Sequence, residues 1–420
     1  MQLSSGTTSK SVNIRPHRVI VAVGGGIAAY KICEVVSALF KMGVELRVIM
    51  TNAAQKFIMP LTFATLSRHP VYTDKNFWQP INSPPLHIKL GEWADLCLIA
   101  PLTANTLGKL THGMADNLLT NTVLASTCPV LLAPAMNTNM WEQPIVNNNW
   151  QHVLSYERFH STETASGLLA CDRVGAGRMA EPVEIISHIQ SLLHTQGKQD
   201  LIGKTILISA GKTREFMDPV RFIGNPSTGK MGVAIARAAI HRGARVILVH
   251  GEVICEQPLG IQTVLVVSAE QMHQEMLRHL PNADVIIMSA AVADVKPRDC
   301  STEKLPKRSL PGSLPLVTVP DIVADLAYHK KPNQKLIGFA AQTGDIVTPA
   351  LEKLRRKNLD LIVANPIDRT ESGFGSNNNQ GILIDKKGNQ QKIPPCSKLR
   401  MAHYLFDFVD QNIFAGEHLH

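Results

Sequence analysis

Short apolar runs that alternate with helical segments constrain the fold of this chain more than any other feature. Arg18–Val23 ends in glycines, Ile27–Phe40 has the spacing of a helix, and Val44–Met50 is a second apolar run. Asp95–Ala100 and Val130–Ala133 continue the pattern. Strands whose apolar residues do not alternate with polar ones are buried on both faces. We therefore expect a parallel sheet with helices on both sides.

The same alternation restarts after a polar segment at residues 194–200. Lys204–Ser209 and Arg245–His250 are typical of strands, and Met231–Arg242 between them is typical of a helix. Three later apolar runs also predict strands: Asp284–Met288, Lys335–Phe339 and Leu359–Ala364.

The restart indicates two domains, and at ~150 residues per domain the length of 420 residues fits two or three. We predict two tandem α/β domains over residues 17–195 and 203–415, after a polar tail over residues 1–16. Pro297–Pro320, rich in Pro, Lys and Ser, predicts a long mobile loop within the second domain.

Composition excludes several classes of protein. Apolar residues make up 45% and charged residues 18%, which is typical of a globular chain. No apolar run reaches the ~18 residues that span a bilayer, and no secretory signal is recognisable. Seven cysteines without a Cys-x-x-Cys pair argue against a disulfide framework or zinc ribbon and favour the cytoplasm. The net charge of +8 permits anionic ligands, but no dense basic tract indicates nucleic-acid or membrane binding.

A glycine cluster follows the first predicted strand. Gly24-x-Gly26-x-x-Ala29 formally matches the dinucleotide-binding fingerprint, in which amides at a helix N-terminus hold a phosphate. NAD binding also requires an acidic residue at the end of the second strand, which here ends in Met50-Thr51. The turn therefore favours the phosphate of another ligand, with a purely structural turn as the alternative.

Five segments together make the first domain more specific: residues 25–31, 86–95, 99–106, 113–119 and 134–141. In this order they resemble the flavin-dependent cysteine decarboxylase family. The resemblance implies a flavodoxin-like or Rossmann-like flavoprotein domain that binds FMN between the subunits of a trimer. The flavin would assist loss of carbon dioxide by oxidising the cysteinyl side chain of the substrate.

The resemblance also implies roles for individual residues. His87 would assist at the substrate thiol, Asn137 would bind the substrate carboxylate, and Cys171 would protonate the enethiolate product. Each alone has a structural interpretation: a polar helix start, a turn residue and a small buried side chain. The family usually has Gly-Asp after the cysteine, whereas this chain has Asp172-Arg173. The implied FMN contacts are Gly26, Ile27, Thr51, Thr103 and Asn105.

A second glycine motif lies in the second domain. Gly224 to Lys230 matches Gly-x4-Gly-Lys, but Met231 stands where a P-loop needs Ser or Thr, and no clear strand precedes it. The wider pattern resembles phosphopantothenate–cysteine ligases, which implies a Rossmann-like α/β ligase domain. The matching segments are residues 213–215, 218–232, 290–294, 303–304, 320–322, 338–341, 358–365, 374–379 and 397–402.

The ligase resemblance implies acyl activation by CTP. The carboxylate of 4′-phosphopantothenate would attack the α-phosphate, releasing pyrophosphate, and the amine of L-cysteine would attack the acyl-cytidylate. Such chemistry uses Mg²⁺ or Mn²⁺ and cationic side chains. Lys304 would lie near the reacting phosphate, and Arg221 and Asn225 would bind the substrate and the acyl-cytidylate. The implied nucleotide-binding set is Ser209, Gly211, Ser227, Gly229, Ala291, Asp294, Lys304, Asp321 and Phe339.

Two departures concern the rate of ligation and metal binding. Leu305-Pro306 interrupts the lysines of the loop that carries Lys304, which alone would be a solvated lysine, and Gln342 replaces the usual Glu. The metal ligands remain open.

Both resemblances together imply a bifunctional enzyme of bacterial coenzyme A biosynthesis. It would make 4′-phosphopantothenoylcysteine and decarboxylate it to 4′-phosphopantetheine. Decarboxylase trimers joined by ligase dimers would form a homo-oligomer, a dodecamer. The alternatives are an NAD(P)-linked reductase and a flavin-binding regulatory subunit without activity.

Overall fold

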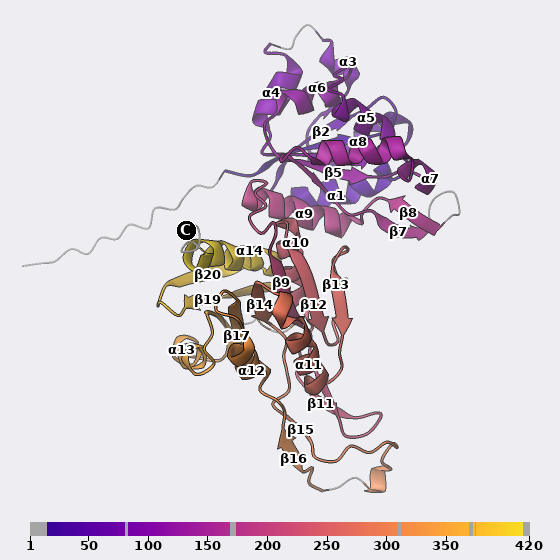
Figure 1. Ribbon diagram of the computed structural model, residues 1–420. Coiled ribbons are helices and arrows are strands. Elements are labelled where there is room, and N and C mark those ends of the chain that lie inside the picture. The colour runs from indigo at the N-terminus through magenta and orange to yellow at the C-terminus, as the bar shows by residue number, and fades with distance from the viewer. Residues whose placement is uncertain are drawn as a thin grey trace, which may run out of the picture. The chain divides into compact units, whose positions relative to one another are not determined.

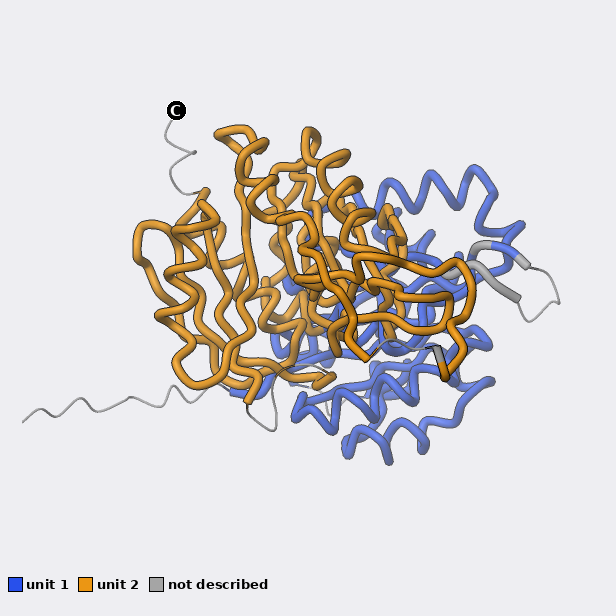
Figure 2. The backbone as a smooth tube through the Cα atoms, turned by 90° about the horizontal axis from the view of Figure 1, so that it is seen from below, with its two compact units in different colours: residues 1–189 blue, residues 190–420 orange. Residues whose placement is uncertain are grey.

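The computed structural model describes residues 15–79, 83–168, 174–309, 312–368, 373 and 375–414 (Figure 1). The chain forms two compact units, residues 1–189 and 190–420 (Figure 2). Within the described residues, no helix has the length and apolar character needed to cross a bilayer.

The division between the units falls inside helix α9 (Pro182–Thr195). The end of this helix belongs to the second unit, because Ser191 Oγ lies 2.7 Å from His241 Nδ1 and 2.9 Å from His403 Nε2. His194 Nε2 also lies 2.7 Å from a carboxylate oxygen of Asp407. Polar composition alone places the boundary at 195–203, so the domain bounds 17–195 and 203–415 stay a prediction.

The first unit is built on a parallel six-stranded sheet in the order β3-β2-β1-β4-β5-β6. Ile20 and Ala22 face helices α4, α5, α6 and α8, while Val19, Val21 and Val23 point to the opposite face and are equally buried. The strands are β1 (Arg18–Val23), β2 (Glu45–Met50), β3 (Val71–Tyr72), β4 (Leu96–Leu102), β5 (Val130–Pro134) and β6 (Phe159–Ser161). The helices are α1 (Ala29–Lys41), α2 (Pro60–Ser67), α3 (Asp74–Phe77), α4 (Leu86–Trp93), α5 (Ala104–Thr111), α6 (Leu118–Ala125), α7 (Thr138–Trp141) and α8 (Pro144–Leu154).

The second unit repeats this order and extends it. Its eight-stranded sheet runs β13-β12-β9-β14-β17-β18-β19-β20, and the last two strands are antiparallel to their neighbours. Helices α10 and α14 pack on one face and α11, α12 and α13 on the other. The strands are β9 (Thr205–Ala210), β12 (Arg245–His250), β13 (Gln262–Leu265), β14 (Val285–Met288), β17 (Lys335–Gln342), β18 (Leu361–Pro366), β19 (Asn378–Asp385) and β20 (Gln390–Ser397). The helices are α10 (Lys230–His241), α11 (Ala269–His279), α12 (Ile322–His329), α13 (Val347–Arg356) and α14 (Lys398–Val409).

The predicted fold class is confirmed: both units are α/β. In each parallel part the order corresponds to 3-2-1-4-5-6, which is the Rossmann order, whereas a flavodoxin has 2-1-3-4-5. The buried strands of the two cores were correctly expected from their apolar runs. Gly43 follows the last turn of α1 with a φ of +79°, as a helix-ending glycine does.

The expectation of an irregular loop over Pro297–Pro320 is wrong at both ends. Strand β15 (Val295–Pro297) pairs antiparallel with β16 (Leu316–Thr318), because β-forming residues stand on both sides of the polar stretch. We call residues 295–318 the arm, since it projects from the sheet layer of its unit (Figure 1). A second small pair, β10 (Arg214–Phe216) and β11 (Phe222–Gly224), precedes the Gly-Lys motif, where no strand was expected.

Glycine at the end of β1 is predicted to be essential for the first unit. A Cβ on Gly24 would lie 2.2 Å from the carbonyl oxygen of Pro101. Because both partners are backbone, we expect Gly24→Ala to lower the free energy of unfolding by about 1–3 kcal/mol. All four tryptophans lie in this unit, so their fluorescence during thermal unfolding reports the change.

Gly108→Ala is the matched control. Its Cβ would make only an ordinary 3.8 Å contact in α5, where alanine is favoured over glycine, so its unfolding temperature should not fall. Equal unfolding temperatures of Gly24→Ala and the unchanged protein would contradict the close approach.

Candidate functional site

The strand order of the first unit reverses between β1 and β4, and the turns after both strands meet at one edge of the sheet. Open α/β sheets bind ligands in the crevice at such a reversal. The turn after β1 packs closely on its neighbours, since a Cβ on Gly25 would lie 2.3 Å from Ala53 Cβ. Only glycine allows this approach, which leaves the start of α1 open to a ligand phosphate.

A cavity of about 470 Å³ opens at this reversal, within the ~300–1,000 Å³ typical of small-molecule sites. Three of the five predicted flavin contacts line it, namely Thr51, Thr103 and Asn105. Gly26 and Ile27 lie in the same turn as the lining residue Gly25 but do not line the cavity. The lining residues are Gly25, Thr51, Asn52, Ala53, Asp74, Thr103, Ala104, Asn105, Thr106, Lys109, Asp116, Asn117 and Met140.

Helix caps fix the hydroxyls and amides around this cavity. Thr103 Oγ1 accepts from the amide of Thr106 at the start of α5, and Asn117 accepts from Thr120 at the start of α6. Lys109 Nζ donates to Asp116 at 2.7 Å, so the one cation among the lining residues is neutralised. The second carboxylate of the lining, Asp74, accepts from the amide of Leu118 at 2.9 Å. This polar lining, with no unpaired cation, fits the hydroxyls of a ribityl chain and the polar edge of a flavin ring.

The structure does not bring His87 into this cavity. It is the second residue of α4, and its ring meets the edge of Phe77 at 5.4 Å between centroids. His87 Nδ1 is buried and has no hydrogen-bond partner in the part of the chain that the structure describes. A buried ring nitrogen without a partner is costly, so His87 Nδ1 is open to a hydrogen bond from a group outside the described residues.

Asn137 lies nearer the cavity. Its side chain accepts from the amide of Asn139 at 2.9 Å and begins α7, which carries the lining residue Met140. The amide of Met136 donates to the carbonyl of Gly177, at the base of the hairpin of β7 (Ala165–Leu168) and β8 (Val174–Arg178). The hairpin base therefore docks beside Asn137. Cys171, predicted as the proton donor, lies outside the described residues.

In the second unit the strand order reverses between β9 and β14. The turn after β9 is held by its neighbours, since Gly211 has a φ of +79° and its Cβ would lie 2.6 Å from the carbonyl oxygen of Glu252. Ser209 Oγ accepts from the amide of Ala290, and Ser289 Oγ donates to the carbonyl of Ser209. Ser209 and Gly211 thus fix the backbone of the turn that borders the crevice.

A pocket lies over the carboxyl ends of β14, β17 and β18, next to the start of α10. It contains four residues of the predicted nucleotide set, namely Ser227, Gly229, Ala291 and Phe339. The other five residues of the set do not line it: Ser209, Gly211, Asp294, Lys304 and Asp321. Several lining residues were not predicted as site residues: Thr228, Lys230, Met231, Ser289, Ala290, Ala341, Asn365, Ile367, Gly373, Gly375, Asn379 and Lys398.

Two of the acids outside the pocket have local partners. Asp321 accepts from the amide of Ala324 at the start of α12 and forms an ion pair with Lys357. Lys353 Nζ donates to the carbonyl of Phe339 at 2.8 Å. Burial lowers the pKa of Lys353, and the nearby charge of Asp294 opposes that shift. Asp294 therefore acts on the base of the pocket through its charge.

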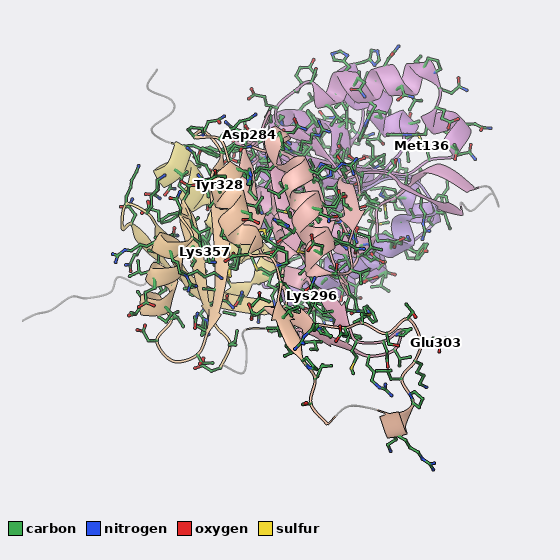
Figure 3. The ribbon with its side chains drawn as sticks, turned by 60° about the horizontal axis from the view of Figure 1, so that its bottom comes forward. Met136, Asp284, Lys296, Glu303, Tyr328 and Lys357 are labelled. Carbon is green, nitrogen blue, oxygen red and sulfur yellow. The ribbon has the colours of Figure 1, made fainter. Side chains whose placement is uncertain are left out.

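A buried carboxylate ties Arg221 to the segment that carries Lys304. Asp218 accepts from the side chain of Arg221 at 2.6 Å and from the amide of Leu305 at 3.3 Å. The same guanidinium donates to the carbonyl of Leu305 at 3.2 Å. Burial opposes the charge of Asp218, but its amide hydrogen bonds and the Arg221 charge outweigh burial and lower its pKa. The main chain next to Lys304 is thus tied to the turn between β10 and β11, partway along the arm, and Figure 3 shows Glu303 well out from Lys296.

Asn225 donates to the carbonyl of Val292 at 3.0 Å, next to the lining residue Ala291. Across the described ranges, no three His, Cys, Asp or Glu side chains are grouped so as to hold a metal ion.

The residues missed by sequence reasoning carried a partial signal. Asp116 and Asn117 belong to the segment 113–119, and Asn365, Asn379 and Lys398 belong to or border segments of the ligase pattern. Tertiary contacts set the positions of lining residues, and these contacts are not visible in a local motif. For example, Nζ of the lining residue Lys230 lies 2.7 Å from the side-chain oxygen of Asn377, 147 residues away.

We predict that Asp218 protects the Lys304 segment from proteolysis. In Asp218→Asn the weaker acceptor loosens the hold on Leu305, so trypsin should cleave after Lys304 several-fold faster. Timed digestion with mass spectrometry measures this rate. Asp299→Asn, an exposed acid of the same arm, should digest like the unchanged protein. Equal rates for all three proteins would show that Asp218 does not anchor the segment.

Comparison with known proteins matches both units to family profiles. Residues 7–194 match the family described as Flavoprotein, and residues 201–413 match the DNA/pantothenate metabolism flavoprotein C-terminal domain. A protein of Bacillus subtilis (strain 168), the coenzyme A biosynthesis bifunctional protein CoaBC, is 44% identical over 385 residues. That match covers 91% of this chain and 94% of the relative.

Two further matches have the same name. The coenzyme A biosynthesis bifunctional protein CoaBC of Vibrio cholerae serotype O1 is 38% identical over 94% of this chain and 98% of its own. Among solved structures, the C-terminal domain of a CoaBC protein is 38% identical, covers 51% of this chain and 97% of its own, and superposes with a TM-score of 0.44.

Proposed function

The chain belongs to the family of bifunctional coenzyme A biosynthesis proteins, and from this premise we propose how its two units divide the reactions. It is an enzyme with phosphopantothenate–cysteine ligase and phosphopantothenoylcysteine decarboxylase activities, and its first unit is a flavoprotein domain. The second unit uses CTP to join L-cysteine to 4′-phosphopantothenate. The first unit uses FMN to convert 4′-phosphopantothenoylcysteine to 4′-phosphopantetheine.

One observation supports the assignment of one reaction to each unit. Each sheet has a cavity at its own strand-order reversal, and the two linings differ in charge. The first has hydroxyls, amides, two carboxylates and a lysine paired with one of them, which suit a ribityl chain and a flavin ring. The second has two lysines and a helix start, which suit a triphosphate.

For decarboxylation, bound FMN would take two electrons from the cysteinyl side chain, which eases loss of carbon dioxide, and would return them so that the product is a thiol. The amide of Asn137 binds the substrate carboxylate, and His87 orients the thiol. Cys171 then donates its proton to the enethiolate carbon. Because His87 lies outside the cavity of its own chain, a neighbouring subunit supplies it, as in the trimer that the family implies.

Exposed apolar side chains near the glycine turn support a trimer. Ile27 is 59% exposed, and Met59 and Leu61 on the segment before and within α2 are 68% and 74% exposed. Exposed apolar side chains of this size are available for contacts between subunits. Trimers of the first unit joined by dimers of the second would give the dodecamer, located in the cytoplasm.

For ligation, the carboxylate of 4′-phosphopantothenate attacks the α-phosphate of CTP and pyrophosphate leaves. The cysteine amine then attacks the acyl carbon and CMP leaves. Lys304 stabilises the charge at the α-phosphate, with Mg²⁺ or Mn²⁺ as the accompanying ion. Arg221 and Asn225 hold the acyl-cytidylate, and Phe339 packs on the nucleotide. Asp218 sets the position of Lys304 through Leu305.

The decarboxylase assignment predicts a selective defect. Cys171→Ser should lower formation of 4′-phosphopantetheine from supplied 4′-phosphopantothenoylcysteine by about 10²–10⁴-fold, since the final proton is missing. Pyrophosphate release by the ligase should be unchanged. Cys33→Ser, whose thiol pKa is raised by burial in the same unit, is the control and should keep both activities. A normal product yield from Cys171→Ser would refute the role of this cysteine.

The ligase assignment predicts the reverse. Lys304→Gln should lower pyrophosphate release by about 10²–10³-fold, since a charge at the reacting phosphate is lost. Decarboxylation of supplied substrate should be unchanged. Arg308→Gln removes a charge from the same arm and should keep both rates. If Lys304→Gln slows both reactions equally, the division of labour between the units is wrong.

A further inference from the structure

Two lysines that the proposed mechanism does not use line the ligase pocket. Lys230 begins α10 and Lys398 begins α14, and both ammonium groups contact the segment between β18 and β19. Lys398 Nζ donates to the carbonyl of Gly373 at 3.1 Å and to that of Ser376. Lys230 Nζ donates to the carbonyl of Gly375 at 2.9 Å. Lys230 uses a second N–H group on the Asn377 side chain, so among the described residues each ammonium has two acceptors for its three N–H groups.

Neither charge is compensated by a carboxylate of the described residues. Lys398 is only 7% exposed, yet in the described part of the chain neither lysine has a carboxylate within ion-pair distance. A buried ammonium without a counter-charge is expensive, and folded proteins pair such groups. The N-termini of two 12-residue helices add positive potential at the same place. Among the described residues, the groups that line the pocket therefore favour an anionic ligand.

The surrounding groups match a ligand with several oxygen atoms. Asn365 is 8% exposed, lines the pocket, and its side chain has no hydrogen bond to another described residue. The turn at Ser227 and Gly229 is drawn close to its neighbours, since a Cβ on Gly229 would lie 2.3 Å from Val253 Cγ1. Backbone amides, a free carboxamide and two ammonium groups form a phosphate-binding surface.

We propose that Lys230 and Lys398 bind the phosphates of CTP that leave as pyrophosphate, a role that rests on the proposed ligase function. The two cations neutralise the charge that develops on the leaving group when the P–O bond to the α-phosphate breaks. Lys304 reaches the α-phosphate from the arm, so attack and departure are assisted by cations from different segments of the chain.

The protonation state of Lys398 makes this role detectable as proton uptake when the nucleotide binds. Burial and the charge of Lys230 lower the pKa of Lys398 to about 8, while Cys255 opposes the shift. Among the described residues, Lys230 and Cys255 are the titratable groups whose charges act on Lys398, and Arg237 in turn acts on Cys255. A phosphate beside the amine favours its charged form and raises the pKa. Nucleotide binding should then take up a proton above pH 8 and none at pH 6.5, where Lys398 is already charged.

Calorimetric titration of the full-length protein tests the proposal, with CTP and CMP as probes in the presence of Mg²⁺. Lys398→Met should weaken binding of CTP about 10- to 100-fold, as expected for a lost charge-assisted hydrogen bond, and that of CMP less than about threefold. Lys398→Arg keeps the charge and should bind CTP at pH 6.5 within a few-fold of the unchanged protein. Lys392→Met, an exposed lysine of β20, is the control.

Proton uptake is measured by repeating the titration at pH 8.5 in two buffers with different ionisation enthalpies. The unchanged protein should take up a fraction of one proton per CTP, and Lys398→Arg should take up none. Equal weakening of CTP and CMP by Lys398→Met, without rescue by Lys398→Arg, would show a structural role and overturn the inference. An unchanged protein that binds neither nucleotide would instead overturn the proposed ligase function on which the inference rests.

Discussion

Each sheet reverses its strand order once, and the position of both cavities depends on this reversal. At β1 and β4, and again at β9 and β14, adjacent strands send their following segments to opposite faces, which leaves a crevice at their carboxyl ends. Glycines allow the turns beside each crevice to pack closely against neighbouring segments. Gly24, Gly25 and Gly211 sit where any Cβ would meet backbone or a neighbouring Cβ at 2.2–2.6 Å. The turns can therefore approach a ligand with their amides.

The same topology supports two chemistries because the units place different charges around it. In the first unit Asp116 neutralises Lys109, and threonine hydroxyls and asparagine amides supply the contacts. In the second unit Lys230 and Lys398 have no carboxylate partner among the described residues. The carboxylate of Asp218 instead accepts from the amide of Leu305 in the arm. A lining without an unpaired cation suits the ribityl chain and ring of a flavin, whereas fixed cations suit a departing pyrophosphate.

Much of the fold could be predicted because the central strands are buried on both faces. Arg18–Val23 and Arg245–His250 are strands with the expected bounds. The antiparallel strands β19 and β20 were missed. Strand β20 is partly exposed and contains two prolines, so neither its composition nor its periodicity indicates a strand. The pairing of β15 with β16 was missed because it joins short segments across the polar stretch of the arm.

The sites were predictable where one motif supplies both residue and position, as for Thr103, Ser227 and Gly229. Residues whose role depends on a distant partner were not. Asp218 meets Leu305 87 residues later, and Lys398 meets the segment at Gly373 and Ser376 only after β19 and β20 form. The placement of His87 outside the cavity follows from how α4 packs on Phe77 of α3, which no local pattern encodes.

The central claim is that one chain performs ligation and decarboxylation in sequence, one in each unit. The most direct measurement supplies the purified protein with FMN, 4′-phosphopantothenate, L-cysteine, CTP and Mg²⁺, and follows pyrophosphate and carbon dioxide together. The account predicts release of both, with carbon dioxide following pyrophosphate after a lag and reaching equal amounts. Pyrophosphate without carbon dioxide, even when 4′-phosphopantothenoylcysteine is supplied directly, would contradict the assignment of the first unit. Carbon dioxide only from that supplied intermediate would contradict the assignment of the second.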